Sequence, residues 1–354
     1  MKKSVSTISR RSLLFGTASV LAAPMVLKGS RAAAKSNSLT ITSSGGSYQE
    51  ILVKTVVNPF TEETGIKVDI LPRPEMAKVK AQQLTGRVDF DVHYPTAAEA
   101  AYGSKEGFWE KLDLSMLDLK DMPIPPTSDV VVTDTYVGGI GWDPKKFGPG
   151  KHPANFVEFF DLKKFPGRRA FLNRAETTLE AALLADGVPP KDIYPLDIDR
   201  AFKALDRIKP GIASWVTQTP QTISLVQTGE VDFSYTYANR VQATNEPGGG
   251  TPLAFSFEQN LLYADPLTIL KGAPNKENAM KYIAYFTRPE VLARLCDLDA
   301  CVPNSKKAMS MMSDQTRKWL PKDIDSPNNL VISGAYWADN LEAVSRRFKE
   351  WALG

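Results

Sequence analysis

Short apolar runs alternate with amphipathic stretches along the chain. Leu39–Thr42 is rich in β-branched residues and predicts a strand. Ser47–Glu50 has the S-x-x-E form of a capping box, so a helix is expected to begin there and to end at Gly65. Lys67–Leu71 and then Asp89–Val92 predict the next two strands. This alternation is typical of an α/β fold with a largely parallel sheet.

The same rhythm continues after a Pro-rich interruption at Met122–Pro126. Two separate strands are expected at Val130–Thr133 and Tyr136–Trp142. Asn275 is the expected N-cap of a helix over residues 276–286. Other expected helices cover residues 77–84, 97–106, 156–160, 178–186, 198–208, 222–228 and 338–353. The length of 354 residues suggests roughly two domains, each able to bury its own core.

The first 34 residues are interpreted as an export signal. Ser9–Leu14 contains the pair Arg10–Arg11 followed by apolar residues, and Ala32–Ala34 fits the small-residue cleavage rule. The apolar run that ends at Leu27 is shorter than the roughly 18–20 residues of a membrane span. A disordered basic arm with a chance Arg-Arg pair is the alternative. We expect residues 1–34 to direct export to the periplasm by the twin-arginine pathway.

The basic charge of the chain is concentrated in this leader, which holds six basic residues and no acidic one. Without the leader, the formal net charge changes from +3 to −3. A nucleic-acid binder would carry a basic face on its folded domain. We therefore expect no nucleic-acid partner.

Cysteine and histidine are scarce in this sequence. In an oxidising compartment the spacing of Cys296 and Cys301 can close a small disulfide, which we expect, with two buried or free thiols as the alternative. The only histidines are His93 and His152. A zinc site needs more such ligands close together, so we predict neither a metal site nor a cofactor.

Four segments resemble the extracellular solute-binding proteins of ABC importers, specifically the spermidine/putrescine-type branch. They are Ser44–Glu50, Pro59–Val68, Gly229–Asp232 and Lys271–Ala279. The resemblance implies a two-lobed α/β periplasmic binding protein fold of type II, with a ligand cleft between lobes joined by two crossover strands. The crossings would fall near Gly138–Trp142 and Leu262–Leu270.

The resemblance also implies a division of the mature chain. Residues 35–138 would form the first part of lobe 1, residues 139–265 lobe 2, and residues 266–354 the second part of lobe 1 with the C-terminal helices. The implied function is capture of a small amine-bearing solute by a monomer, which delivers it to an ABC permease in the inner membrane.

Loops that follow strands hold the candidate ligand contacts, because ligands of open α/β sheets bind outside the carboxyl ends of strands. Relatives commonly place an aromatic at the position of Tyr237, where it packs on an ammonium group, and an acid such as Asp265 can accept hydrogen bonds from that group. A core or surface role is the alternative for each, as for Tyr336–Trp337 before the last helix. The candidates are Ser44, Gly46, Tyr48, Tyr94, Thr96, Thr177, Gln218, Tyr237, Arg240, Tyr263 and Asp265.

Arg240 and Asp265 bear on the identity of the solute. A polyamine carries only positive charge, so an arginine would repel it, and the segment 39–49 lacks the acid that polyamine binders usually offer there. An Arg–Asp pair suits an amino-acid-like zwitterion such as γ-aminobutyrate. Arg240 could instead pair at the surface with Glu230, Asp232 or Glu246. Polyamine and zwitterion both stay open, with a thiamine-like cation or an iron complex as other solutes.

An enzyme is the competing class of protein. Hydrolase triads need a histidine, and neither His93 nor His152 accompanies a nucleophile motif such as G-x-S-x-G. We therefore expect no catalytic residues, with a secreted cofactor enzyme as the alternative.

Overall fold

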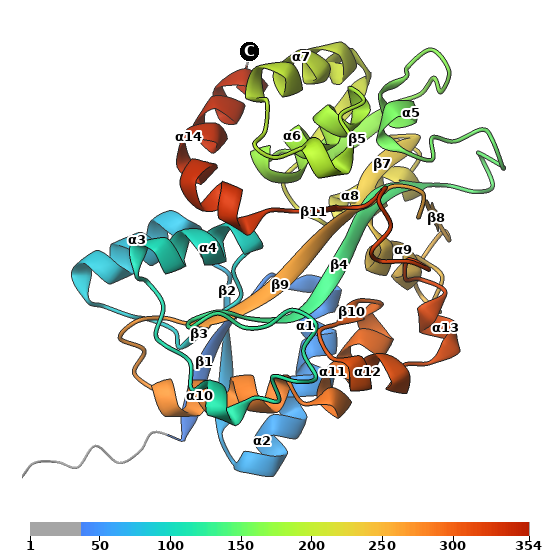
Figure 1. Cartoon of the computed structure of the whole chain (residues 1–354). Coiled ribbons are helices and arrows are strands. Elements are labelled where there is room, and N and C mark those ends of the chain that lie inside the picture. Colours follow the sequence, from blue (N-terminus) through green and yellow to red (C-terminus); the bar gives the residue numbers. More distant parts are fainter. Residues whose placement is uncertain (1–36, 354) are drawn as a thin grey trace, which may run out of the picture. The chain divides into compact units, whose positions relative to one another are not determined.

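The computed structural model of the protein describes residues 37–353 (Figure 1), so the predicted leader lies outside the described residues. Within this range helices and strands alternate. The strands are β1 Ser38–Ser43, β2 Lys67–Pro72, β3 Val92–His93, β4 Val131–Trp142, β5 Arg169–Leu172, β6 Ile212–Val216, β7 Phe233–Tyr237, β8 Ala254–Phe255, β9 Leu261–Ile269, β10 Val302–Pro303 and β11 Leu330–Val331.

Helices form the C-terminal end of the described chain and most of the connections between strands. A π-helical segment, Val53–Val57, joins the first two helices into one rod. The α-helices are α1 Gly46–Leu52, α2 Asn58–Thr64, α3 Met76–Thr85, α4 Ala97–Glu106, α5 Phe156–Phe160, α6 Ala175–Ala185, α7 Ile198–Ile208, α8 Gln221–Gln227, α9 Ala238–Thr244, α10 Lys276–Phe286, α11 Pro289–Asp299, α12 Lys306–Met311, α13 Asp314–Arg317 and α14 Gly334–Leu353. No helix in residues 37–353 is long and apolar enough to cross a membrane.

The strands form a mixed sheet in the order β2-β1-β3-β9-β4-β7-β5-β6. β1 pairs in parallel with β2 and β3, and β5 pairs in parallel with β6 and β7. Between these two parallel groups lie β4 and β9, which run antiparallel to each other and to their neighbours β7 and β3. The expected α/β alternation therefore builds two parallel groups joined by an antiparallel pair.

β4 and β9 run side by side through the described part of the chain (Figure 1), and their residues belong to two separate hydrophobic cores. Val131 of β4 pairs with Leu267 of β9, and both belong to the core built from the N-terminal strands and α10–α12. Further along the same strands, Val137 pairs with Leu262, and both belong to the other core. The paired strands thus leave one lobe and enter the other.

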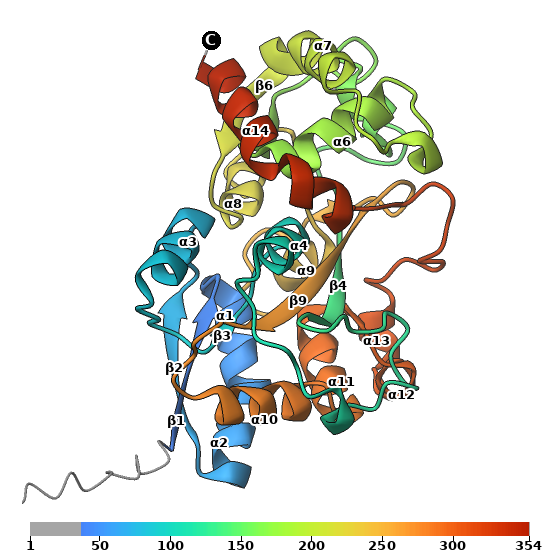
Figure 2. The same ribbon diagram turned by 60° about the vertical axis from the view of Figure 1, so that its left-hand side comes forward.

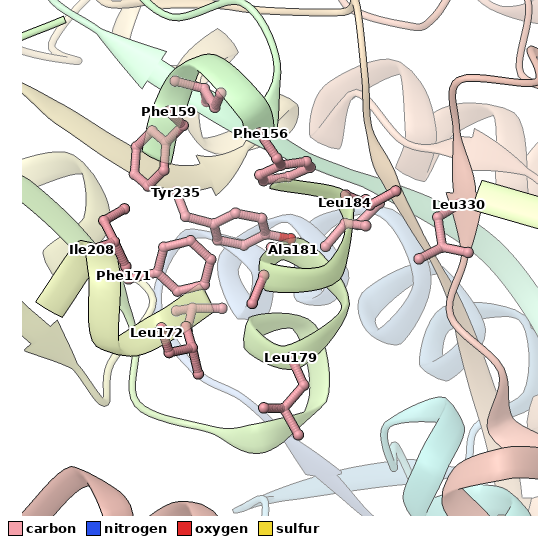
Figure 3. Packing of buried hydrophobic residues seen from close by; sticks show 14 of the residues in the cluster. Phe156, Phe159, Phe171, Leu172, Leu179, Ala181, Leu184, Ile208, Tyr235 and Leu330 are labelled. Atoms are coloured by element: carbon pink, nitrogen blue, oxygen red, sulfur yellow. The ribbon is translucent and has the colours of Figure 1, made fainter. Parts of the chain in front are cut away.

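The second core consists mainly of aromatic and branched side chains of β5, β7, α5 and α6. Figure 3 shows the rings of Phe156, Phe171 and Tyr235 packed together, with ring centroids 5.2 Å apart for the last two. The C-terminal helix α14 adds buried Trp337 and Phe348 to this core. The same helix also packs against α4 of the other lobe (Figure 2).

Three boundaries differ from the sequence prediction. β4 is one continuous strand, because Thr135 of the expected break pairs with Ala264 on one side and Val302 on the other. The strand expected to start at residue 89 is only β3, Val92–His93. The last helix begins at Gly334, four residues before the expected start.

Predicted helix ends were partly correct. Gly65 ends α2 in the left-handed conformation with φ 71°, which confirms the expected C-cap. The expected capping box was wrong: α1 starts at Gly46, and its cap is Gly45 at φ 75°, a conformation that favours glycine. Asn275 occupies the expected N-cap position, but its side chain donates to Asp91 Oδ2 at 3.1 Å instead of capping α10.

The expected disulfide is confirmed: Cys296 and Cys301 are bonded, with Cα atoms 4.7 Å apart. The bond closes a short loop at the end of α11, and short loops gain modest stabilisation from closure. The double substitution Cys296→Ala and Cys301→Ala should lower the free energy of unfolding by about 2 kcal/mol. Urea unfolding of oxidised protein measures this, and a double variant as stable as the unmodified protein would contradict it.

Candidate functional site

A cavity of about 150 Å³ is bordered by loops and strands of both lobes. Its walls combine charged groups with tyrosine rings, which suits a small polar solute. The lining residues are Ser44, Tyr48, Arg73, Thr96, Ala97, Tyr136, Arg174, Glu176, Thr219, Tyr237, Asn239, Arg240, Tyr263, Ala264 and Asp265.

One face of the β4–β9 pair contributes to the cavity wall. Tyr136 lies opposite Tyr263, and Asp134 lies opposite Asp265. Residues two apart on a strand share a face, so all four side chains project to the same side. The next position on that face of β4 is Gly138, where a Cβ would come within 2.0 Å of the Tyr235 hydroxyl. Glycine therefore makes room for the hydrogen bond between the hydroxyls of Tyr235 and Tyr263, 2.7 Å long.

The structure brings most of the residues predicted from the sequence to this cavity. The predicted residues that line it are Ser44, Tyr48, Thr96, Tyr237, Arg240, Tyr263 and Asp265. They reach it from the ends of β1 and β7, from the interior of β9, and from the starts of α1, α4 and α9. Their convergence follows from the pairing of β4 with β7 and β9.

The other four predicted residues do not line the cavity. Gly46 is the exposed first residue of α1, and Gln218 is exposed beside the lining residue Thr219. Tyr94 is buried in the core, where its hydroxyl shares a 2.8 Å hydrogen bond with that of Tyr282. Thr177 is buried behind the wall and accepts a hydrogen bond from the Tyr263 hydroxyl at 2.8 Å.

Three lining residues that sequence reasoning missed carry much of the site's chemistry. Arg73 and Arg174 follow the carboxyl ends of the parallel strands β2 and β5, so the rule that selected the other loops could have found them. Tyr136 lies inside β4, where no loop signal exists. Its place in the wall depends on its pairing with Tyr263.

Arg174 is held by hydroxyl groups. Its Nη2 donates to the Tyr237 hydroxyl at 2.6 Å and to Thr177 Oγ1 at 3.0 Å. Its guanidinium carbon lies 5.8 Å from the centroid of the Tyr263 ring. Among residues 37–353 no carboxylate approaches it within ion-pair distance of 4.0 Å. The guanidinium is thus oriented beside the cavity with its charge unpaired.

Carboxyl groups gather at Asp265, the residue of β9 that lines the cavity. Burial raises the pKa of Asp265 to about 7; Arg73 opposes this shift and Asp299 adds to it. Burial also raises the pKa of Asp134, with a further contribution from Asp265, and Asp134 Oδ2 has no hydrogen-bond partner in the described part of the chain. This concentration of acid favours a cation in front of Asp265.

Glu176 is a second carboxyl in the cavity wall. Burial raises its pKa to about 7, and the charge of Arg174 partly opposes the shift. Its Oε1 is buried without a hydrogen-bond partner among the described residues. Glu176 is therefore only partly ionised near neutral pH when the cavity is empty.

Two contacts beside the cavity connect the lobes. Arg240 of α9 donates to Ser47 Oγ of α1. Asn239 of α9 donates to Asp299 Oδ1 at 3.2 Å, and Asp299 Oδ2 accepts from the Tyr136 hydroxyl at 2.6 Å. Asp299 lies inside the loop closed by the disulfide. These contacts hold the lobes together around the cavity.

One group of potential metal ligands occurs in residues 37–353: Asp134, Cys296 and Cys301. The two sulfurs are bonded to each other, so neither offers a thiolate to a metal. His93 is buried away from the cavity, and burial lowers its pKa to about 3. His152 is stacked on Trp142 with ring centroids 3.7 Å apart.

Comparison with protein families and curated proteins gives consistent matches. The family described as bacterial extracellular solute-binding protein matches residues 55–320. A gamma-aminobutyric acid-binding protein of Pseudomonas aeruginosa is 31% identical over 335 residues, which cover 91% of this chain and 92% of the relative. A spermidine/putrescine-binding periplasmic protein of Escherichia coli is 24% identical over 321 residues, which cover 86% of this chain and 88% of the relative.

Solved structures with the same fold include ligand complexes. A structure described as a GABA receptor has a TM-score of 0.81 and 31% identity, covering 89% of this chain and 97% of the other. The binding protein AgtB from A. tumefaciens R10, in complex with agropinic acid, has a TM-score of 0.80 and 29% identity, covering 90% of this chain and 99% of the other. These neighbours confirm the expected two-lobed α/β fold.

Proposed function

Because the chain belongs to the family of bacterial extracellular solute-binding proteins, we propose that it captures a small zwitterion, with an ammonium group and a carboxylate, for an ABC importer. The observation that carries this proposal is the presence of Asp265 and Arg240 in the wall of one small cavity. The relative named for γ-aminobutyrate, itself such a zwitterion, supports the same class of solute.

The two ends of the solute would meet different parts of the wall. The ammonium group would lie against the carboxylate of Asp265, with the rings of Tyr48 and Tyr136 beside it. The carboxylate would accept hydrogen bonds from the guanidinium of Arg240, whose planar fork matches two oxygens at once. A polyamine has no group for an arginine, so the three arginines of the wall disfavour it.

Closure of the lobes would trap the solute. Tyr48 lies on α1 of the first lobe and Arg240 on α9 of the second, so a solute that touches both stabilises the closed form. The contact between Arg240 and Ser47 would form only on closure, because it joins α9 to α1. No chemistry on the solute is proposed, and opening at the permease would release it.

Several further features belong to this proposal. Lobe 1 would comprise residues 35–138 and part of 266–354, and lobe 2 residues 139–265, with α14 packed on the core of lobe 2. Residues 1–34 would direct twin-arginine export to the periplasm, and relatives named as periplasmic support that compartment. The protein would act as a monomer.

A binding screen tests the proposed function. Residues 35–354 would be titrated calorimetrically with γ-aminobutyrate, putrescine, spermidine and thiamine, and the thermal stability followed in parallel. A solute at 100 times its Kd should add about 2.7 kcal/mol to the stability of the native state. Binding of γ-aminobutyrate without binding of the polyamines supports the proposal. Binding of polyamines alone would contradict it and favour the polyamine branch of the family.

Affinity for γ-aminobutyrate should increase with pH. The pKa of Asp265 is raised to about 7, so the empty site is mainly protonated below that pH, whereas an ammonium group prefers the ionised carboxylate. From about pH 6 to about pH 8 the ionised fraction rises from roughly one tenth to nine tenths, so the Kd should fall roughly tenfold. Calorimetry across this range measures it. The rise should persist in Glu176→Gln and vanish in Asp265→Asn; a flat profile in the unmodified protein would contradict it.

A further inference from the structure

The cavity contains more positive charge than a simple zwitterion needs. Three arginines line it, Arg73, Arg174 and Arg240, against two carboxyl groups, Glu176 and Asp265. Arg73 already faces a carboxylate outside the wall, because its Nη1 lies 3.8 Å from Glu99. Arg174 and Arg240 have no carboxylate within 4.0 Å in the described part of the chain. A solute with one carboxylate would leave one of these two guanidinium groups unpaired.

Arg174 is oriented by hydroxyl groups and an aromatic ring rather than by a carboxylate. The Tyr237 hydroxyl and Thr177 Oγ1 accept its hydrogen bonds, and the Tyr263 ring lies beneath it, so its orientation is set before any solute arrives. Its Nη1 donates to no group among residues 37–353. A pre-oriented guanidinium loses little conformational entropy when it binds a carboxylate.

Glu176 does not form an ion pair with Arg174. None of its oxygens lies within 4.0 Å of Arg174, and burial keeps its carboxyl partly protonated near neutral pH. Arg240, by contrast, reaches towards the other lobe and donates to Ser47. The two guanidinium groups are therefore anchored at different places around the same cavity.

We propose that the solute of this cavity is an amino dicarboxylate, in which one carboxylate is bound by Arg240, the second by Arg174, and the ammonium group by Asp265. This proposal rests on the proposed function and narrows its solute class. The cavity has a volume of about 150 Å³. A cavity of about this volume in another protein holds benzene, so the size of this one suits a compact amino dicarboxylate.

Glutamate and γ-aminobutyrate form a matched pair for the test, since they differ by a single carboxylate on the carbon that bears the amine. Isoglutamine, which carries an amide in place of that carboxylate, keeps the size and removes the charge. Calorimetry on residues 35–354 would compare these three probes, with both enantiomers of glutamate and isoglutamine. At least one enantiomer of glutamate should bind about tenfold more tightly than γ-aminobutyrate. It should also bind about tenfold more tightly than the isoglutamine of the same configuration.

Substitution of Arg174 assigns the second carboxylate. Arg174→Gln should weaken glutamate binding at least about tenfold more than it weakens γ-aminobutyrate binding, while Arg174→Lys keeps most of the preference for glutamate. Binding of γ-aminobutyrate by Arg174→Gln shows that the variant is folded.

Three results would overturn the inference. If γ-aminobutyrate binds as tightly as glutamate, no group in the cavity binds the second carboxylate. The proposed capture of a zwitterion then stands, and only the narrower proposal of an amino dicarboxylate fails. If neither probe binds, both proposals fail together. Equal losses for both probes in Arg174→Gln would show that Arg174 binds the carboxylate that they share, which also contradicts the assignment.

Discussion

Asp265→Asn should weaken the binding of the amine-bearing solute by about 100-fold, which corresponds to about 2.7 kcal/mol. Asp265 lines the cavity on β9 and is the carboxyl that would face the ammonium group. Asparagine keeps the shape but removes the negative charge, and losing one partner of a buried charged pair leaves the other charge unpaired. Calorimetric Kd values for the two proteins measure the effect.

The same substitution should leave the free energy of unfolding of the solute-free protein unchanged or increase it. The pKa of Asp265 is raised on folding, so its ionisation destabilises the native state above the unfolded pKa, and this penalty is full above about pH 7. Asp265→Asn should therefore unfold at the same or a higher urea concentration near pH 8. Asp134→Asn is the matched control for the Kd measurement, because Asp134 pairs with Asp265 across the strands but does not line the cavity. An unchanged Kd in Asp265→Asn would refute the assignment of the ammonium site.

Trp337→Ala should lower the free energy of unfolding by about 3–5 kcal/mol. The Trp337 side chain is 0% exposed and belongs to the core of the second lobe. Its Nε1 donates to Glu180 Oε1 at 2.7 Å, and Glu180 is itself fully buried. Alanine would leave a large cavity and remove a hydrogen bond from a buried carboxylate. Urea unfolding at neutral pH measures the change.

Trp337→Phe separates the two causes. Phenylalanine keeps most of the ring but cannot donate to Glu180, so the expected loss is only about 1–3 kcal/mol. Glu180 retains hydrogen bonds from the Tyr194 hydroxyl and the Thr177 backbone, each 2.8 Å long. Equal losses for both variants would show that the ring packing contributes little. Stability of Trp337→Ala within about 1 kcal/mol of the unmodified protein would contradict the core role.

Candidate ligand contacts could be predicted from the sequence where a local rule applied. Tyr237 and Asp265 line the cavity, in line with the rule that ligands bind near strand ends and the crossing strands. The same rule failed for Tyr94, because its hydroxyl turns inward to Tyr282 rather than towards the cavity. A loop's place in the chain is readable from the sequence, but the direction of each side chain is not.

Trp337 illustrates the same limit for the core. From the sequence alone, Tyr336–Trp337 could be interpreted either as cleft residues or as buried aromatics that hold the last helix in place. The structure buries Trp337 against Glu180, which lies 157 positions earlier in the chain. Only the packing of α14 on α6 distinguishes these two possibilities.

The sequence by itself determined the α/β alternation, the left-handed helix end at Gly65 and the disulfide spacing, because these depend on neighbours a few residues apart. Only the tertiary structure decided that Arg73, Tyr136 and Arg174 share a cavity. Their elements meet through a sheet whose central pairing joins residues more than a hundred positions apart, as Tyr136 pairs with Tyr263. Burial, the unpaired charge of Arg174 and the raised pKa of Asp265 all arise from that assembly and not from local sequence.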